Sequence, residues 1–492
     1  MDVKRGDHEL VSFALGPVAA IGGGAVVLLL AVARRYGWHR DELYFLAAGR
    51  HLDWGYVDQP PFTPFVARVA DAIAPDDLVV LRILPASATA VSIAMGALIA
   101  RELGGGRRAQ VLSAGAMAGG FALGVGHILA TATFDLLAWL TLLWLAARLL
   151  RTGAPRWWLA FGAVAGLAAL NKDLGPLLGF SLGAGLVVER RWDLLRSWWL
   201  VAGVAVALLV AAPNLQWQVA NGWPQFEMGR AIADRLGVEN RVSLLPFQVV
   251  FVGPLLAWLL WRGAGWLRRE PAAGAYRALL WAWPAGIVAA FVTAGRPYYV
   301  LPLTMVVLIG GLVATEQRGP VRAAAWCVVV NVVTTLPFAL PLLPMSTLSG
   351  GGIALANQAA NETVGWPQLA DQVAGIVRGL PPADRAHVML LTGSYGEAGA
   401  LDRFGPARGL PDAYSPHNGY WYFRAPSDDA AVVVAIRFSV AELSPWFREC
   451  TQVAKVDNGF DISNEVQGQP ILVCRGLRGS WSDVWPRLRF LA

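Results

Sequence analysis

The stretch YYVLPLTMVVLIGGLVAT, residues 298–315, contains no charged side chain. A helix needs about 20 mostly apolar residues to cross a hydrocarbon layer of about 30 Å, so this stretch predicts a membrane span. The whole chain of 492 residues has the same character, because 56% of it is hydrophobic and only 15% is charged. An ordinary soluble domain carries about 25% charged residues. The sequence therefore predicts a polytopic α-helical membrane protein.

The charge of the chain fits a membrane protein. Lys and Arg number 40 against 34 Asp and Glu, which gives a net charge of +6. In membrane proteins such an excess lies in cytoplasmic loops, so it does not predict a nucleic-acid partner. The sequence also has no GxxxxGK[ST] loop, which argues against an ATP-driven module.

Apolar stretches of similar length predict about eleven spans. Arginines cluster in every second connection, as at 101–108, 148–156 and 262–277, and positive residues favour the cytoplasmic side. The N-terminus is therefore expected inside, and the alternate loops at 34–80, 127–135, 171–176, 214–242 and 295–297 are expected to share the outer face. The predicted spans are 11–33, 81–101, 109–129, 132–150, 157–171, 174–188, 197–213, 243–262, 278–294, 298–315 and 321–342.

The composition changes near residue 345 to polar residues, turns and short β-like runs. We therefore predict a transmembrane domain at 1–344, whose first extracytoplasmic loop at 34–80 carries interfacial helices. Residues 345–492 are predicted to form an extracytoplasmic soluble α/β domain of ordinary size. Cys450 and Cys474 both lie in that domain beside strand-like sequence, and an extracytoplasmic compartment permits a disulfide between them without requiring one.

The loop at 34–80 holds the first candidate site residues. Asp41 and Glu42 directly follow the first predicted span. An acidic pair at this place can have no role beyond capping the N-terminus of an interfacial helix, where the helix dipole stabilises carboxylates. Alternatively, a carboxylate held at the membrane boundary can take a proton from an acceptor.

Further ionisable residues lie on the expected outer face. Asp135 begins a span, Lys172 interrupts an apolar run, and Arg296 precedes the tyrosine pair at 298–299. A helix cap, a snorkelling lysine and tyrosines anchored at the interface would explain these residues without a function. Ionisable residues at such depth are nevertheless rare and tend to be functional. Together they predict a shared site for an anionic lipid headgroup.

Several motifs resemble one family. RDELYF at 40–45 with GYVDQPP at 55–61 resembles the first-loop signature of bacterial GT-C glycosyltransferases. These are the dolichyl-phosphate-mannose-protein mannosyltransferase-like proteins of glycosyltransferase family 39 and the related aminoarabinose transferases. The stretches at 133–135, 166–172, 213–224, 297–302 and 395–421 resemble the same family. The chain departs at Gln59, where His is usual, and at Asn171-Lys172-Asp173, where Ser/Thr-Lys is commoner, so the donor headgroup stays open.

The resemblance implies that a sugar moves from a polyprenyl-phosphate donor to an acceptor outside the cytoplasm, with inversion at the anomeric carbon. It implies that Asp41 is the catalytic base, Asp135 a second acid, Lys172 a cation beside the phosphate, and Tyr298 or Tyr299 a residue near the donor. Position along the chain adds Glu42 to the catalytic candidates and Arg296 to the phosphate-binding ones. The sugar- or acceptor-binding candidates are Tyr44, Tyr56, Asp58, Gln59, Trp217, His417 and Asn418.

The acceptor class and the cofactor stay open. The acceptor is a lipid, a protein or a cell-wall glycan, and membrane lipids surround the protein. No cofactor is certain, although carboxylates suit Mg²⁺ or Mn²⁺, with Asp41 and Asp135 as the candidate ligands. A lipid-linked sugar flippase or other secondary transporter is the main alternative function, and it predicts inverted repeats that the sequence does not show. A scaffold without catalytic activity is a third.

Overall fold

A computed structural model describes residues 10–349 and 357–492 of the chain. These residues form two compact units. The first unit comprises Met1–Ala31, Arg82–Ala220 and Ile232–Ala339, and the second comprises Val32–Leu81, Asn221–Ala231 and Leu340–Ala492. The loop at 34–80 thus groups with the C-terminal residues and not with the helices that flank it in sequence.

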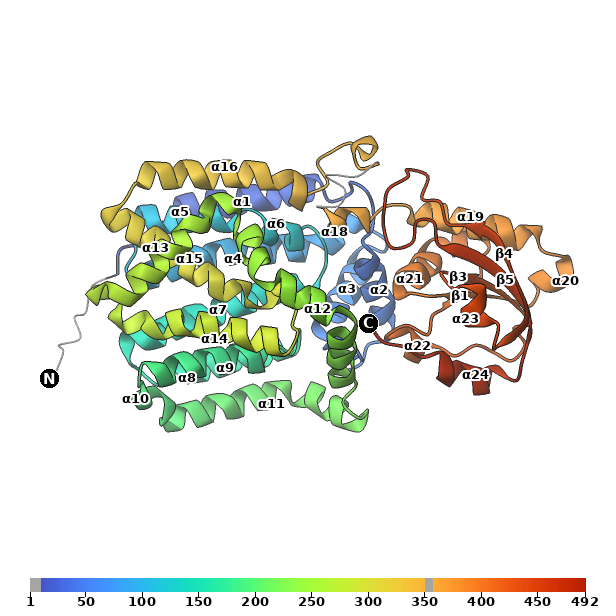
Figure 1. The fold of residues 1–492 in the computed structure, drawn as a ribbon, viewed down its shortest axis with the longest axis horizontal. Coiled ribbons are helices and arrows are strands. Elements are labelled where there is room, and N and C mark those ends of the chain that lie inside the picture. Colours follow the sequence, from blue (N-terminus) through green and yellow to red (C-terminus); the bar gives the residue numbers. More distant parts are fainter. Residues whose placement is uncertain (1–9, 350–356) are drawn as a thin grey trace. The chain divides into compact units, whose positions relative to one another are not determined.

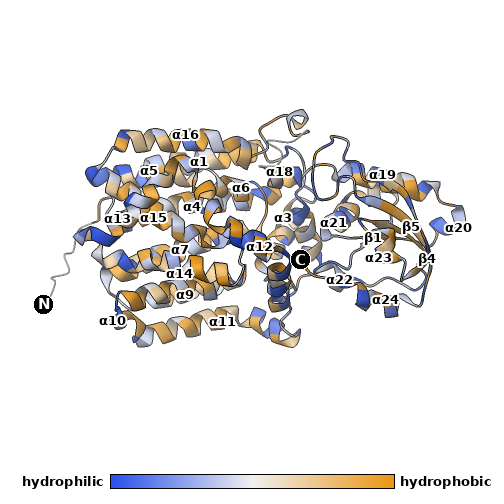
Figure 2. Ribbon diagram, in the orientation of Figure 1, coloured by the Kyte–Doolittle hydropathy of each residue, from blue (hydrophilic) through white to orange (hydrophobic). Residues whose placement is uncertain are grey.

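The first unit is a bundle of apolar helices, drawn in blue to yellow in Figure 1, and their ribbons are largely orange and pale in the hydropathy view of Figure 2. The closest packing within it joins α8 to α11, α13 to α15, and α9 to α14. Its elements are α1 (Leu15–Ala31), α4 (Leu78–Glu102), α5 (Arg107–Met117), α6 (Phe121–Gly126), α7 (Thr131–Thr152), α8 (Trp157–Ala169), α9 (Gly175–Val188), α10 (Trp192–Leu195), α11 (Trp198–Ala220), α12 (Pro224–Val252), η1 (Pro254–Leu256), α13 (Ala257–Arg269), η2 (Pro271–Tyr276), α14 (Arg277–Val292), η3 (Pro297–Val300), α15 (Leu301–Arg318) and α16 (Val321–Ala339).

The length and composition of these helices make the chain a multi-pass membrane protein. Six described helices are long and apolar enough to cross a bilayer, or seven if the bent pair α12 and α13 counts as one span. The apolar helices α1, α8 and α9 are shorter, with 17, 13 and 14 residues. At 1.5 Å per residue, 13 residues reach about 20 Å, which is less than the hydrocarbon thickness. The count of eleven spans therefore stays a prediction.

The sequence-based boundaries differ from the structure at two places. The predicted span 243–262 is not one helix, because α12 ends at Val252 and the chain bends by 83° before α13. Gly253 makes this bend with a φ of +96°. The predicted span 109–129 is also broken, between α5 and α6, where Gly120 has a φ of +54°. A positive φ favours glycine, because glycine lacks the Cβ atom that would clash in this conformation.

The loops of the first unit gather at two ends of the bundle. At one end, Asn171 donates to the carbonyl of Thr131 and Gln248 donates to that of Pro297. At the other end, the arginine-rich connections meet: Arg151 Nε lies 2.6 Å from Glu102 Oε1, and Glu316 accepts from the backbone of Gly106. The alternation of loops between the two sides of the membrane, and which side is cytoplasmic, stay predictions.

The second unit contains a small mixed sheet with helices around it. The strands run in the order β2-β1-β3-β5-β4; β1 is parallel to β2 and β3, and β5 is antiparallel to β3 and β4. The strands are β1 (Val388–Thr392), β2 (Ala413–Tyr414), β3 (Val432–Ile436), β4 (Phe447–Lys455) and β5 (Pro470–Leu477). The helices are α2 (Arg40–Arg50), α3 (Phe62–Ile73), η4 (Met345–Thr347), α18 (Gln358–Asn361), α19 (Trp366–Gly379), α20 (Pro382–Arg385), α21 (Tyr395–Phe404), η5 (Pro406–Arg408), α22 (Tyr420–Phe423), α23 (Val440–Leu443) and α24 (Trp481–Leu488).

The sheet confirms the strand-like runs predicted at 431–436 and 470–473. The apolar residues of β3 and β5 pack with Trp481 and Trp485 of α24 in one core. Cys450 of β4 and Cys474 of β5 are directly opposite each other and form a disulfide. The pairing that the sequence left open is therefore present.

Candidate active site

Lys172 is the centre of a cluster in the first unit. It follows α8 in the short break before α9, and its backbone N–H still donates to Ala168. Its Nζ lies 3.1 Å from the hydroxyl of Tyr298, 4.6 Å from the centre of that ring and 4.8 Å from the centre of the Tyr299 ring. A cation over aromatic faces is attracted by their negative quadrupole. The two tyrosines therefore hold the ammonium group at this end of the bundle.

Asp135 and Arg296 belong to the same cluster. Asp135 lies in the first turns of α7, is 6% exposed, and is close enough to interact electrostatically with Lys172. Arg296 precedes η3, and its charge acts on Tyr299. The structure thus brings all four residues that were predicted to bind the donor phosphate together with the second predicted acid. Trp217 lies half-buried near the C-terminal end of α11 in the same unit.

Asp41 and Glu42 have different local roles at the start of α2 in the second unit. His39 is the N-cap, and the buried Glu42 completes a capping box by accepting from the His39 backbone over 2.8 Å. Such a reciprocal cap satisfies two of the N–H groups that a helix start leaves without partners. Glu42 therefore does the capping that the sequence allowed for the pair, and the Asp41 carboxylate accepts from the hydroxyl of Tyr395.

Three side chains surround the Asp41 carboxylate. The hydroxyl of Tyr395, on α21, donates to Oδ1 over 2.9 Å. Arg40 Nε lies 3.6 Å from the same oxygen, while the outer nitrogen of that guanidinium pairs with Glu465. His39 Nδ1 lies 3.8 Å from the other oxygen, Oδ2, and also accepts from the Asp41 backbone N–H. These contacts fix the orientation of the Asp41 carboxylate.

Asp58 is the second carboxylate of this unit. The hydroxyl of Tyr44 donates to its Oδ1 over 2.9 Å, and Asn418 also bonds its side chain. Burial raises the pKa of Asp58 from 3.8 to about 7, and the negative charge of Asp41 adds to the rise. Because burial penalises the charged form, Asp58 is poised to gain or lose a proton near neutral pH.

The other predicted sugar-binding residues lie around these two acids. The Tyr56 hydroxyl donates to the carbonyls of Ala48 and His51 and so closes the end of α2. Gln59 is buried, and its Nε2 has no hydrogen-bond partner among the described residues. The His417 ring stacks on Tyr395 at 5.0 Å, and the backbone of Asn418 bonds to Phe490. Asp58, Asn418 and His417 are thus grouped, whereas Tyr56 is used by the local fold.

Sequence reasoning missed Tyr395, Arg40 and Glu465 as site residues. Tyr395 begins the stretch 395–421, which was noted for its resemblance to the family but from which only His417 and Asn418 were taken as candidates. Its partner Asp41 is more than 350 residues away in sequence. No local pattern predicts that contact.

The structure adds no support for a particular metal. In residues 10–349 and 357–492, no group of three or more His, Cys, Asp and Glu side chains is placed to hold an ion. Asp41 and Asp135 belong to different compact units. Mg²⁺ or Mn²⁺ therefore stays an untested expectation.

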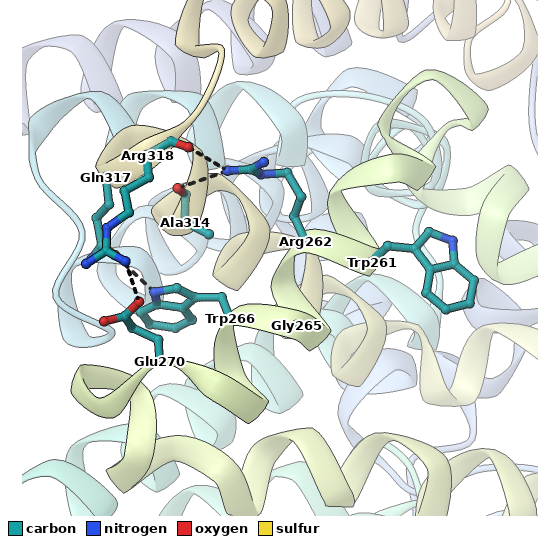
Figure 3. A pocket seen from close by; sticks show the side chains of 8 residues that line it. All are labelled: Trp261, Arg262, Gly265, Trp266, Glu270, Ala314, Gln317 and Arg318. Carbon is teal, nitrogen blue, oxygen red and sulfur yellow. Dashed lines mark hydrogen bonds and ion pairs between the residues drawn. The ribbon is translucent and has the colours of Figure 1, made fainter.

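A separate hollow of about 240 Å³ lies between α13 and α15 (Figure 3). Its polar groups bond to one another: Arg262 donates to the carbonyls of Ala314 and Arg318, and Arg318 pairs with Glu270 at 3.3 Å. No residue predicted for the site lines it. We therefore assign the hollow no part in the candidate site.

Comparisons with known proteins point to one fold. A family model described as dolichyl-phosphate-mannose-protein mannosyltransferase matches residues 58–217. The structure of ArnT from Cupriavidus metallidurans bound to undecaprenyl phosphate is 19% identical, with 92% of this chain and 97% of that chain covered and a TM-score of 0.56. Its apo structure is 18% identical, with 94% and 98% covered and a TM-score of 0.59. No curated protein sequence matches the chain.

These likenesses show that the chain has the fold of the ArnT structures. The motif resemblance seen in the sequence is confirmed by the family match over 58–217 and by the fold. The matched segment includes Asp58, Asp135 and Lys172 and ends at Trp217.

Proposed function

We propose that this protein is a membrane glycosyltransferase. It takes a sugar from a polyprenyl-phosphate donor and transfers it to a lipid, protein or glycan acceptor on the extracytoplasmic side of the membrane. The fold it shares with an ArnT whose structure holds undecaprenyl phosphate supports this donor class. The family match over 58–217 supports sugar transfer as the reaction.

The observation that carries the proposal is the Lys172 ammonium, held over Tyr298 and Tyr299 at one end of the helix bundle. A lipid-linked phosphate stays at headgroup depth, and a fixed cation there stabilises the charge that grows on it as it leaves. Asp135 counters the charge of Lys172 from α7. Because tyrosine hydroxyls and rings are neutral, they orient the cation without cancelling its charge.

In the proposed step Asp41 accepts the proton of an acceptor hydroxyl or amine. The acceptor atom forms a new bond to the anomeric carbon, while the bond from that carbon to the phosphate oxygen breaks. The electron pair of the broken bond leaves with the lipid phosphate, the group that Lys172 and Arg296 are proposed to bind. A single displacement from the opposite side inverts the anomeric configuration. The reaction needs no soluble nucleotide.

The sugar- and acceptor-binding set is part of the proposal. Tyr44, Asp58, Asn418 and His417 lie within one compact unit, close to Asp41. Polar groups beside aromatic rings suit a sugar, whose hydroxyls take hydrogen bonds while its apolar face packs on a ring. The departure at Gln59 leaves the sugar itself undetermined.

The test is transfer of radiolabelled sugar from a panel of polyprenyl-phosphate sugars, in membranes that contain the wild type or the Asp41→Asn variant. Label leaves one donor with the wild type and stays on it with Asp41→Asn, and the donor consumed names the sugar. Asp53→Asn is the matched control, because Asp53 is an exposed acid of the same loop. Equal donor loss with the wild type and with Asp41→Asn would reject Asp41 as the base. No loss from any donor with folded protein would favour a transporter.

A further inference from the structure

Two glycines of α21 bring this helix unusually close to α2. A Cβ added at Gly399 would lie 2.9 Å from the side chain of Leu43, and one added at Gly396 would lie 3.0 Å from that of Arg40. Real Cβ atoms essentially never approach as closely as at Gly399, and the contact at Gly396 would also be tight, so glycine at both positions allows this approach. The motif GSYGEAG at 393–399 thus has a structural purpose, which is to let α21 of the C-terminal region lie against the helix that carries Asp41.

The same contact places Tyr395 at the first position of α21. Ser394 caps the helix by accepting from the backbone of Gly396, which fixes where the helix begins. The Tyr395 ring is then held from several sides: His417 stacks on it at 5.0 Å, Tyr44 lies at 4.7 Å, and the Arg40 guanidinium lies 5.8 Å from the ring centre. A ring packed in this way has little freedom to turn.

The Tyr395 hydroxyl donates to Asp41 Oδ1 over 2.9 Å. Burial and the negative charge of Asp41 raise the pKa of Tyr395 well above its ordinary value, so the phenol keeps its proton and remains a donor. Arg40 Nε lies 3.6 Å from the same Asp41 oxygen, and the outer nitrogen of that guanidinium pairs with Glu465. The Tyr395 hydroxyl is the shorter of these two contacts to Oδ1, and it comes from α21.

We infer that Tyr395 is a positioning residue for the proposed transfer. Its hydroxyl holds the Asp41 carboxylate in the orientation from which it takes the acceptor's proton, so the C-terminal region completes the site instead of only covering it. This inference rests on the proposed function. It assigns a role to a tyrosine outside the segment that matches the family model.

The test is Tyr395→Phe, which removes the hydroxyl and keeps the ring in its stack. We expect kcat to fall about tenfold or more, because a hydrogen bond to a charged group is lost where orientation matters. The KM for the donor should stay the same, since the donor phosphate is held by other residues. Binding of polyprenyl phosphate is titrated in parallel, and kcat is expressed per binding site, so that partial misfolding does not enter the result.

The matched control is Tyr420→Phe. Tyr420 is a fully buried tyrosine of the same unit whose hydroxyl bonds to Asp402 over 3.2 Å. We expect its kcat per binding site to stay within about twofold of the wild type, because the lost bond does not involve Asp41. The inference is overturned if Tyr395→Phe keeps wild-type kcat while wild-type turnover depends on Asp41. It is also overturned if the two variants lose kcat equally. Absence of donor turnover in the wild type itself would instead reject the proposed function.

Discussion

The two ends of the helix bundle hold their charged groups in opposite ways. At the arginine-rich end, Glu102 is 1% exposed and lies 2.6 Å from Arg151 and 3.7 Å from Arg148. At the other end, the closest partner of Lys172 is the hydroxyl of Tyr298. Tyrosine hydroxyls also hold charged groups in the second unit, where Asp41 and Asp58 each accept a hydrogen bond from one.

We propose that this difference separates charges that stabilise the fold from those that take part in the proposed transfer. An ion pair at short distance cancels its own field, so Glu102 and its arginines serve to join helices. A charged residue that is held by a phenol is oriented by a neutral group. Lys172, Asp41 and Asp58 are held in this way, and all three were singled out from the sequence. We therefore expect substitutions in the first group to change stability and those in the second to change turnover.

The largest expected effect is that of Lys172→Met on turnover. Removing the cation should lower kcat about 100-fold, the usual cost of losing one group that stabilises charge in a transition state. The melting temperature should change little, because Tyr298 and Tyr299 still pack on each other at 5.0 Å. Lys172→Arg keeps the charge and should retain more activity. If Lys172→Met instead lowered the melting temperature and left kcat unchanged, the proposed difference between the two ends of the bundle would be contradicted.

Glu102→Gln should lower the stability of the protein and leave its turnover unchanged. The neutral amide leaves two half-buried arginines without their counter-charge, and the free energy of unfolding should fall by about 2 kcal/mol. Thermal unfolding in detergent measures this change, and kcat per folded molecule should match the wild type. A variant of normal stability with lost turnover would show that this end of the bundle takes part in the reaction.

A smaller effect is expected in the pH dependence of stability. With its pKa raised to about 7, Asp58 holds its proton in the folded protein while the unfolded chain ionises near its ordinary value of 3.8. The folded state then binds more protons, so Asp58 lowers stability as pH rises from about 4 to about 7. Unfolding of the wild type and of Asp58→Asn across this range should diverge by on the order of 1 kcal/mol, given the half-buried position. Parallel curves would mean that Asp58 ionises normally.

The sequence predicted the class of fold because hydrophobic length is a local property. The apolar runs, the C-terminal strands at 431–436 and 470–473, and the shared end of Asp135, Lys172 and Tyr298 were all predicted. The bend after α12 was missed because the apolar run continues through Gly253-Pro254. Hydropathy alone does not register a change of backbone direction.

The arrangement of the loop at 34–80 could not be predicted in the same way. Asp41 and Glu42 look alike in sequence, and only the geometry of the His39 cap separates the one from the other. The contact of Asp41 with Tyr395 depends on how a five-stranded sheet places the start of α21. Such long-range placement follows from packing of the whole unit, which no window of the sequence contains.

The close contact between α2 and α21 also has a consequence for synthesis of the protein. The α2 face that includes Leu43 is made early, whereas the glycines at 396 and 399 emerge from the ribosome more than 350 residues later. At about 5 to 20 residues per second, that interval lasts on the order of tens of seconds. During this time the buried face of α2 lacks its final neighbour. Biogenesis of this protein therefore leaves the face of α2 that includes Leu43 without α21 until the glycines at 396 and 399 have been translated.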